Sequence, residues 1–285
     1  MPSGPLDLST SLAALYLSGG PRPFEPVRRQ WPGVEHVLRS APEDPDALAR
    51  AGYRQEALLL ADPQLCEWAT YQVRTGTCMT AIHDLYPRRW LAALRHAAPP
   101  ALWIAGKMPP GPFLSVVGSR KIAKKDALFA TAVGREAVAQ GYSVASGGAS
   151  GCDTASMAEV GARGLELLPR GLCPADEGTG RCRLSTRPPG EDFTSAAAME
   201  RNALIYAISD RTVVVHARLN EGGTWSGART ALRRRLCTVL VRVRAGDPAS
   251  RALIALGAIP IEHPEEVTAV QSPRGDRLPL PDGEP

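Results

Sequence analysis

The chain has 285 residues, of which 44% are hydrophobic and 22% are charged, and these proportions predict one or two globular domains with a sizeable core. The formal net charge of +4 excludes a histone-like polycation, but the charge is unevenly spread. Residues 262–285 hold six acids and two bases, a net charge of −4, so residues 1–261 carry +8. This asymmetry favours a polyanionic partner, with an arginine-rich genome composition as the alternative explanation.

The six cysteines and five histidines are scattered along the chain and include no C-x-x-C pair, so we expect neither a metal site nor a disulfide scaffold. Unpaired thiols are typical of a reducing compartment, which predicts a cytoplasmic protein. No basic segment followed by an apolar one stands at the start, and no long apolar run occurs. We therefore expect no signal peptide and no contact with a membrane.

Residues 1–81 are rich in alanine, leucine, arginine and proline, and they predict a small helical N-terminal region. Short helices are expected at 8–18, 34–40, 45–51 and 63–74. A turn at 84–87, a helical face made of Trp90, Leu91 and Leu94, and a strand at 101–105 follow. A proline-rich linker at 109–112 then leads into the repeating part of the main domain, which we place at 82–262.

Strands and helices alternate through this main domain. Apolar runs predict strands at 113–117, 142–145, 165–168, 182–186, 212–217, 237–243 and 259–261. Helices are predicted at 124–140, 152–163, 196–209, 225–235 and 248–256, the first with an apolar face of Leu128, Ala132, Val133 and Val138. The predicted fold class is α/β, a Rossmann-like parallel-rich sheet flanked by helices. Residues 263–285 are acidic and rich in proline, and we expect a disordered tail.

Three loops that suit a phosphate each follow a predicted strand directly. Glycines let the backbone approach a phosphate, and helix N-termini direct N–H groups at it. Because the carboxyl ends of parallel strands meet at one edge of a sheet, we expect the loops to converge on one crevice, although each alone is also a common tight turn. The predicted DNA- or phosphate-binding residues are Gly118, Ser119, Arg120, Lys121, Ser146, Gly147, Gly148, Gly151, Asp153, Arg201, Asn202, Gly222, Gly223 and Thr224.

Arg120 is the strongest candidate among these residues. Its planar guanidinium suits a phosphate, and the glycine at 118 leaves room for a ligand; the alternative is a surface charge or a salt bridge. Arg201 is predicted to point back toward the crevice or to form an ion pair with Glu200 or Asp210.

Other side chains have two interpretations each. Asp153 orients a ribose or, the favoured interpretation, caps a helix, and Asn202 ties loops through bonds to the backbone or contacts the ligand. Trp225 is the best candidate for stacking on a base, whereas Phe113, Phe129 and Phe193 are expected in the core. Two basic clusters would bind phosphates or form solvated faces: Lys121, Lys124, Lys125, Arg233, Arg234, Arg235, Arg242 and Arg244.

The order of motifs resembles the DNA-processing protein A family (DprA, also called Smf), a branch of the Rossmann-like superfamily that also holds the LOG nucleotide phosphoribohydrolases. The resemblance covers residues 82–243 and departs from the family pattern at Ser150 and Ser156, where arginine and histidine are usual. It rests on Asp84-Leu85-Tyr86-Pro87, Gly118-Ser119-Arg120, the loop at 146–153, Pro188-Pro189-Gly190, Arg201-Asn202 and Gly223-Thr224.

The resemblance implies a non-enzymatic homodimer without cofactor that binds and protects single-stranded DNA and helps to load a RecA-type recombinase during natural transformation and recombination. Arg120 would contact the DNA backbone. The alternatives are a nucleotide-binding sensor and a LOG-like hydrolase in the same crevice. The hydrolase needs a glutamate shortly after Gly222-Gly223-Thr224, and residues 225–230 contain no acid. The charge asymmetry adds the hypothesis that the acidic residues 264–285 block the basic surface.

Overall fold

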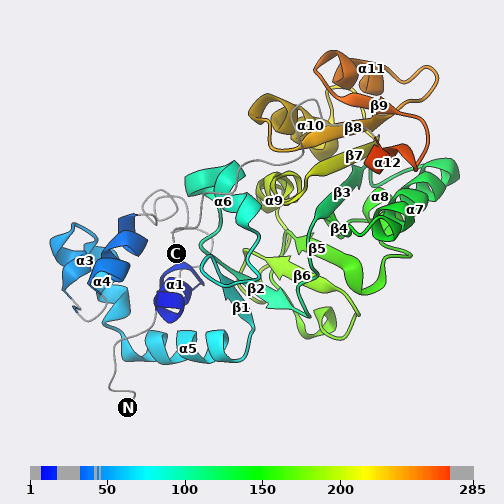
Figure 1. The fold of residues 1–285 in the computed structure, drawn as a ribbon. Coiled ribbons are helices and arrows are strands. Elements are labelled where there is room, and N and C mark those ends of the chain that lie inside the picture. Colours follow the sequence, from blue (N-terminus) through cyan, green and yellow to red (C-terminus); the bar gives the residue numbers. More distant parts are fainter. Residues whose placement is uncertain (1–7, 18–32, 42–43, 45, 270–285) are drawn as a thin grey trace.

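The computed structural model describes residues 8–17, 33–41, 44 and 46–269. A nine-stranded sheet crosses the molecule with helices on both of its faces, and the N-terminal helices gather beyond one of its ends (Figure 1). The strands are β1 (Cys78–Thr80), β2 (Ala101–Ala105), β3 (Phe113–Gly118), β4 (Ser143–Ser146), β5 (Gly164–Leu168), β6 (Cys182–Ser185), β7 (Arg211–His216), β8 (Thr238–Arg242) and β9 (Ile259–Ile261).

The strand order is β1-β2-β6-β5-β4-β3-β7-β8-β9. Strands β3 to β9 all run parallel, and only β2 pairs antiparallel, with β1 and with β6. The predicted parallel-rich α/β sheet is therefore confirmed. From β3 the chain first builds the sheet outward through β4, β5 and β6, then returns to the other side of β3 and adds β7, β8 and β9. This reversal makes the carboxyl ends of β3 and β7 the place where open α/β sheets bind ligands.

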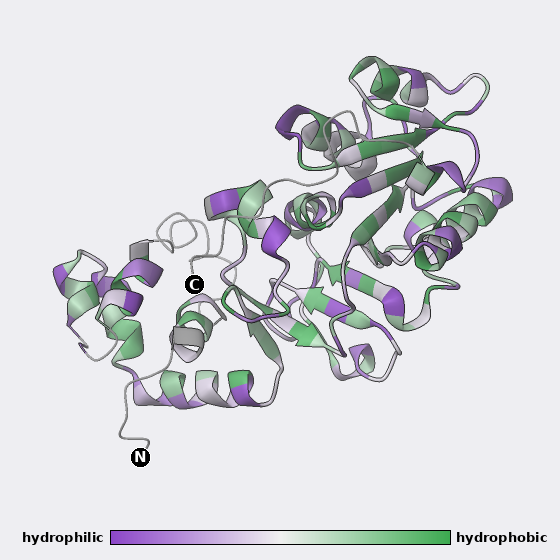
Figure 2. Ribbon diagram, in the orientation of Figure 1, coloured by the Kyte–Doolittle hydropathy of each residue, from purple (hydrophilic) through white to green (hydrophobic). Residues whose placement is uncertain are grey.

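Two helical layers cover the sheet. The helices are α1 (Leu8–Leu17), α3 (Ala47–Arg50), α4 (Arg54–Leu60), α5 (Pro63–Arg74), α6 (Arg88–Leu94), α7 (Lys124–Ala139), α8 (Cys152–Ser156), α9 (Ser195–Ile208), α10 (Gly222–Arg234), α11 (Pro248–Ala255) and α12 (Glu266–Ala269), and residues 33–40 are also helical. Leu114 and Val116 of β3 pack with α7 and α8, whereas Val214 of β7 belongs to the core shared with α9, α10 and α11. The central strands are hydrophobic along most of their length, as expected for strands buried on both faces (Figure 2).

Helix α9 is held firmly over the sheet, and this helix carries Arg201 and Asn202. The indole of Trp90 on α6 donates a hydrogen bond to the Leu204 carbonyl (2.9 Å), and Trp90 is fully buried. On the other side, the Ser115 hydroxyl of β3 donates to the Ile205 carbonyl (2.9 Å). These bonds anchor α9 to α6 and to β3.

The prediction that residues 1–81 are helical is wrong at the C-terminal end of this range, and one helix within it was missed. Residues Cys78–Thr80 form β1, which pairs with β2 and so belongs to the sheet, and the helix Arg54–Leu60 was missed. A three-residue strand next to the N-terminal helices has too few residues to show an alternating pattern. The division into a helical region at 1–81 and a main domain at 82–262 stays a prediction.

Two helices of the main domain differ from their predicted extent or face. Helix α8 ends at Ser156 rather than at 163, because the chain turns back through Gly161, which has a positive φ, to begin β5. On α7, Leu128 is 62% exposed, and the neighbouring Phe129 and Ala130 are buried instead. Of the predicted apolar face, Val133 is buried and Val138 packs against the core, so Leu128 is the misplaced residue.

The predicted disordered tail is wrong for residues 266–269. They form helix α12, with Val267 fully buried, and the Arg211 guanidinium donates hydrogen bonds to the carbonyls of Val267 and Thr268 (both 3.1 Å). Residues 270–285, and with them most of the segment in the tail-blocking hypothesis, lie outside the described residues. No described helix combines the length and apolar character needed to cross a membrane.

Candidate phosphate-binding site at the carboxyl edge of the sheet

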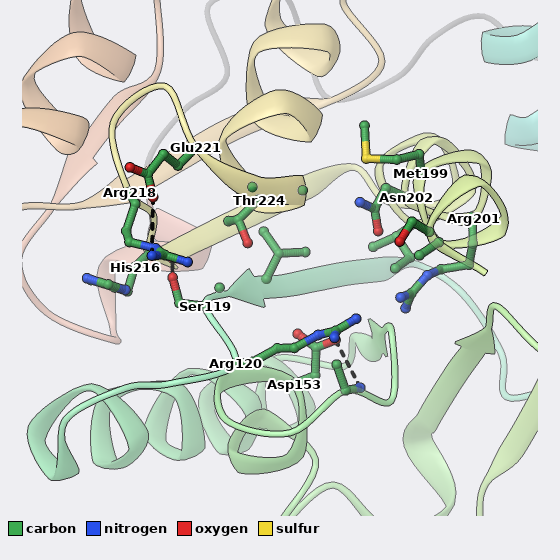
Figure 3. Close-up of a pocket in the computed structure, with 18 of the residues that line it drawn as sticks. Ser119, Arg120, Asp153, Met199, Arg201, Asn202, His216, Arg218, Glu221 and Thr224 are labelled. Carbon is green, nitrogen blue, oxygen red and sulfur yellow. Dashed lines mark hydrogen bonds and ion pairs between the residues drawn. The ribbon is translucent and has the colours of Figure 1, made fainter. Parts of the chain in front are cut away.

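A cavity of about 640 Å³, which we call the main cavity, opens at the carboxyl ends of β3 and β7 (Figure 3). Its walls come from helix α9 and from all three loops predicted to handle phosphate. The expected convergence of these loops is therefore seen in the structure, and their role in binding DNA or phosphate stays a prediction. The predicted residues that line this cavity are Gly118, Ser119, Arg120, Lys121, Asp153, Arg201, Asn202, Gly222, Gly223 and Thr224.

The first loop is clamped between β7 and the second loop. The Ser119 N–H donates to the His216 carbonyl (3.0 Å), and the Cys152 N–H donates to the Ser119 carbonyl (3.3 Å). Gly151 has a φ of +80°, and a Cβ there would overlap the Arg120 carbonyl. Glycine at 151 therefore serves the close approach of two backbones, and the backbone of Arg120 is fixed while its side chain stays free to reach a ligand.

Arg120 is exposed and takes part in no salt bridge among the described residues. Its guanidinium lies 5.3 Å from the centre of the Phe193 ring, a cation–π arrangement. Phe193 is 46% exposed, so its predicted place in the core is wrong. It lies in the segment between β6 and α9, at the rim of the main cavity, where no layer of the fold covers it.

Arg201 is buried at the floor of the main cavity, beneath the second loop. Its Nη1 donates to the Leu167 carbonyl (3.0 Å), and a Cβ at Gly147 would overlap its guanidinium. Burial raises the pKa of the nearby Asp153 to about 6, although the positive charge of Arg201 acts to lower it. For the Arg201 guanidinium, burial has the opposite effect and lowers the pKa. The two side chains partly neutralise each other in a region poor in water.

Two expectations about these buried residues are wrong. Arg201 pairs with neither predicted acid, because Glu200 binds Arg187 (2.6 Å) and Asp210 binds Arg89 (2.7 Å). Asp153 is not a helix cap: Gly151 is the N-cap residue of α8, and the Asp153 carboxylate instead accepts a hydrogen bond from the Ala149 N–H (3.3 Å). Periodicity gives the face of a helix but not which tertiary partner lies opposite.

Some predicted site residues do not line the main cavity. The Ser146 hydroxyl is buried and donates to the Val116 carbonyl (3.1 Å), which ties β4 to β3. Gly147 and Gly148 line a neighbouring cavity of about 370 Å³. These residues shape the loop that carries Asp153 and do not point into the main cavity.

The sequence interpretation missed several side chains that line the main cavity. His216 ends β7 and Arg218 follows it, so a search for polar residues directly after strands would have found both. Burial lowers the pKa of His216 and raises that of Tyr206 well above its usual value. Within the described ranges, the Tyr206 hydroxyl, the His216 Nδ1 and the Arg201 Nε are buried without a hydrogen-bond partner. Polar atoms in that condition are suited to a polar ligand or to ordered water.

Other candidates take structural roles. Trp225 is only 5% exposed and belongs to the hydrophobic core, so it is no stacking platform. Arg242 and Arg244 both form salt bridges with the buried Asp126 (2.7 and 3.1 Å), and Arg242 also covers the Phe129 ring. Arg233, Arg234 and Arg235 are exposed at the end of α10 and do not line the main cavity. No group of three or more histidine, cysteine or acidic residues suited to a metal ion occurs in the described parts of the chain.

Phe193 provides a test of base stacking at this rim. Replacing Phe193 with alanine is expected to weaken binding of an oligothymidylate by about tenfold, because stacking of a base on an aromatic ring contributes about 1–3 kcal/mol. The salt dependence of binding should stay as in the wild type, because the substitution removes no charge. Fluorescence anisotropy at several salt concentrations measures both quantities, and Phe193→Tyr, which keeps the ring, should bind as the wild type does. Unchanged affinity in Phe193→Ala would remove Phe193 from the site.

Fold and site together define a Rossmann-like α/β protein with a basic cavity at the reversal point of its sheet. The family model described as DNA recombination-mediator protein A matches residues 77–168 and 177–271, and the chain belongs to this family. No curated protein matches the chain significantly in sequence.

Two solved structures support the assignment of the fold. DNA processing protein A (DprA) from Streptococcus pneumoniae superposes with a TM-score of 0.68 at 20% sequence identity, covering 92% of this chain and 97% of that one. DNA processing protein A from Helicobacter pylori, described for its single-stranded DNA binding mode, gives a TM-score of 0.57 at 20% identity, covering 66% of this chain and 93% of that one.

Proposed function

We propose that this protein binds single-stranded DNA in the main cavity and acts in DNA processing and recombination. Membership of the DNA recombination-mediator protein A family supports the proposal. The observation that carries it is the pair formed by Arg120 and Phe193 at the mouth of the cavity. The guanidinium has no salt bridge to any described residue, and the ring beside it is half-exposed. A guanidinium suits a phosphate, and an exposed aromatic ring suits a base.

The remaining walls of the cavity fit the same ligand. Helix α10 begins at Gly222 without a side-chain cap, so its first N–H groups are available to a phosphate. Lys121 adds positive charge, and the Tyr206 hydroxyl, which has no hydrogen-bond partner among the described residues, offers a hydrogen bond to a sugar or a base. The charged groups would hold the backbone without reading the sequence, so we expect weak sequence preference.

We further propose, on the strength of the family alone, that the protein works as a homodimer in the cytoplasm. It would protect incoming single strands during DNA uptake and help to load a RecA-type recombinase on them. It would do so without catalysis and without a cofactor.

Of the two alternatives, the nucleotide sensor has an observation in its favour. A cavity of about 640 Å³ is within the size range of small-molecule sites, and its buried polar atoms would suit a nucleotide. The LOG-like hydrolase is disfavoured, because α10 has no acid in its first turns. Neither of the two carboxylates that line the cavity takes the place of this acid. Glu221 precedes the glycines and pairs with Arg218 (3.2 Å), and Asp153 is buried.

A titration across salt concentrations separates these functions. Labelled single strands of about 20 nucleotides, longer than the usual site size of about 4–16 nucleotides, should bind tightly at about 50 mM salt and lose affinity steeply toward about 200 mM. The matching duplex should bind more weakly, because its bases are not free to stack. Binding of free nucleotides without binding of the oligonucleotide would favour the sensor, and release of free base from a nucleotide would favour the hydrolase.

A further inference from the structure

A cavity along one side of helix α10 has no part in the proposed function. It has a volume of about 670 Å³, and we call it the α10 cavity. Most of its lining residues belong to α10, and Asn220 before this helix and Leu256 after α11 complete the walls (Figure 1). It shares only Gly222 with the main cavity. A cavity of this volume is within the size range of sites for small molecules.

The charged side chains that line the α10 cavity are both positive. Arg229 and Arg233 line it, and its nine lining residues include no carboxylate. Both arginines are exposed, and neither forms a salt bridge with a described residue. They are four residues apart on one helix, so they are neighbours on its surface. The negative C-terminal end of α10 favours an arginine at 233 but does not account for one at 229, in the middle of the helix.

Trp225 lines the same cavity and has a polar atom without a partner. The residue is 5% exposed, and its indole Nε1 is buried without a hydrogen-bond partner among the described residues. The Arg229 guanidinium, one turn further along α10, lies 5.9 Å from the centre of the indole ring, a cation–π arrangement. An indole N–H can only donate, and buried donors normally have an acceptor. A ligand in the α10 cavity would provide this acceptor.

Two hydroxyls add to the donors of this cavity. Ser226 and Thr230 line it, and neither hydroxyl is bonded to a described residue. Hydroxyls within a helix often bond the carbonyl four residues earlier, so these two are available to a ligand instead. Guanidiniums, an indole N–H and hydroxyls without any nearby carboxylate favour a ligand that carries negative charge and accepts several hydrogen bonds. A phosphate has both properties.

We propose that the α10 cavity binds a diphosphate group, either as free pyrophosphate or as part of a nucleotide. Arg229 and Arg233 each bind one of the two phosphates, since neighbouring positions on a helix suit two linked anionic groups. The Trp225 indole N–H and the two hydroxyls donate to the remaining oxygens. This inference goes beyond the proposed function and does not depend on it, because the α10 cavity contains neither Arg120 nor Phe193.

Isothermal titration calorimetry of the full chain with pyrophosphate, and separately with ADP, tests the site. The wild type should bind both compounds. Arg229→Gln and Arg233→Gln should each bind them at least about tenfold more weakly, because each substitution removes a hydrogen bond between two charged groups. Arg251→Gln should bind as the wild type does and is the matched control, because Arg251 is an exposed arginine of the neighbouring α11 that does not line the cavity. A wild type that binds neither compound, or arginine variants that bind as the control does, would overturn the proposal.

The indole of Trp225 gives a second readout that leaves the arginines unchanged. In protein labelled with ¹⁵N-tryptophan, the Trp225 indole signal is the one missing from Trp225→Phe. This signal should shift when pyrophosphate is added, and the other indole signals should stay in place. A Trp225 signal that does not move while calorimetry reports binding would place the ligand elsewhere and contradict the proposal.

Two further titrations separate the α10 cavity from the proposed DNA site. Pyrophosphate should bind Arg120→Ala as it binds the wild type, and oligothymidylate should bind Arg229→Gln as tightly as Arg251→Gln. Loss of pyrophosphate binding in Arg120→Ala would place the diphosphate in the main cavity. Weaker binding of oligothymidylate by Arg229→Gln would assign the α10 cavity to the DNA backbone, and either result would overturn the proposal. If the wild type binds pyrophosphate as expected and no oligothymidylate, the proposed function is wrong and the diphosphate site stands.

Discussion

Replacing Arg120 with alanine is expected to weaken binding of single-stranded DNA by about 10- to 100-fold at low salt, because a hydrogen bond to a charged group contributes about 1.5–3 kcal/mol. The side chain makes no salt bridge among the described residues, and its backbone is held by its neighbours, so its removal should leave the fold intact. Fluorescence anisotropy of a labelled oligothymidylate measures the loss.

The salt dependence of the same titration identifies the cause. Loss of one phosphate contact should reduce the slope of log affinity against log salt by about 0.7 for a single strand. Arg135→Ala is the matched control, because Arg135 is an exposed arginine of α7 that lines none of the cavities at the sheet edge. An unchanged slope together with an unchanged affinity in Arg120→Ala would contradict the assignment of a phosphate to this residue.

Replacing Arg201 with methionine is expected to lower the free energy of unfolding by roughly 2–4 kcal/mol near pH 8, because the substitution leaves the buried Asp153 carboxylate without a nearby positive charge. The hydrogen bond to the Leu167 carbonyl is lost as well. Urea denaturation measures the loss, and methionine keeps most of the buried volume, so packing contributes little to it.

The pH dependence of this loss distinguishes the charge from the hydrogen bond. In the wild type the folded pKa of Asp153 is about 6, above its unfolded value, so the folded state binds the additional proton as the pH falls through about 6. Without Arg201 this pKa rises further. The loss of stability should therefore be largest near pH 8 and smaller near pH 5, where Asp153 is neutral in both proteins.

A second substitution provides the control. Asp153→Asn in the Arg201→Met background should restore part of the lost stability near pH 8 and little of it near pH 5, because asparagine carries no charge to bury. An equal loss at both pH values, without restoration by Asp153→Asn, would show that the carboxylate and the guanidinium do not interact.

The sheet could be predicted from the sequence because its central strands are buried on both faces. The runs at 113–117 and 212–217 are mostly apolar, and each stands between turn residues that mark its ends. The end of helix α8 and the strand at 78–80 depend on tertiary packing rather than on a local sequence pattern. Helix α8 stops at Ser156 because β5 must begin at Gly164, and residues 78–80 become a strand because β2 offers them a free edge.

The candidate site was predictable in its backbone and not in its side chains. Glycines after strands locate the three loops, and the position of strand ends brings the loops together. The exposure of Phe193 and the burial of Trp225 depend on which elements cover them, and that information is tertiary. The partner of Arg201 is likewise set by the depth of α9 over β4 and β5, which no local sequence pattern records.

Photocrosslinking with a strand of 5-bromodeoxyuridine tests the central claim most directly, because it reports where the bases lie in the unaltered protein. Mass spectrometry of the crosslinked peptides should find the modification in the segment that carries Phe193 and in the loops after β3 and β7. Crosslinks confined to the N-terminal helices or to Arg233, Arg234 and Arg235 at the end of α10 would contradict a binding site at the carboxyl edge of the sheet.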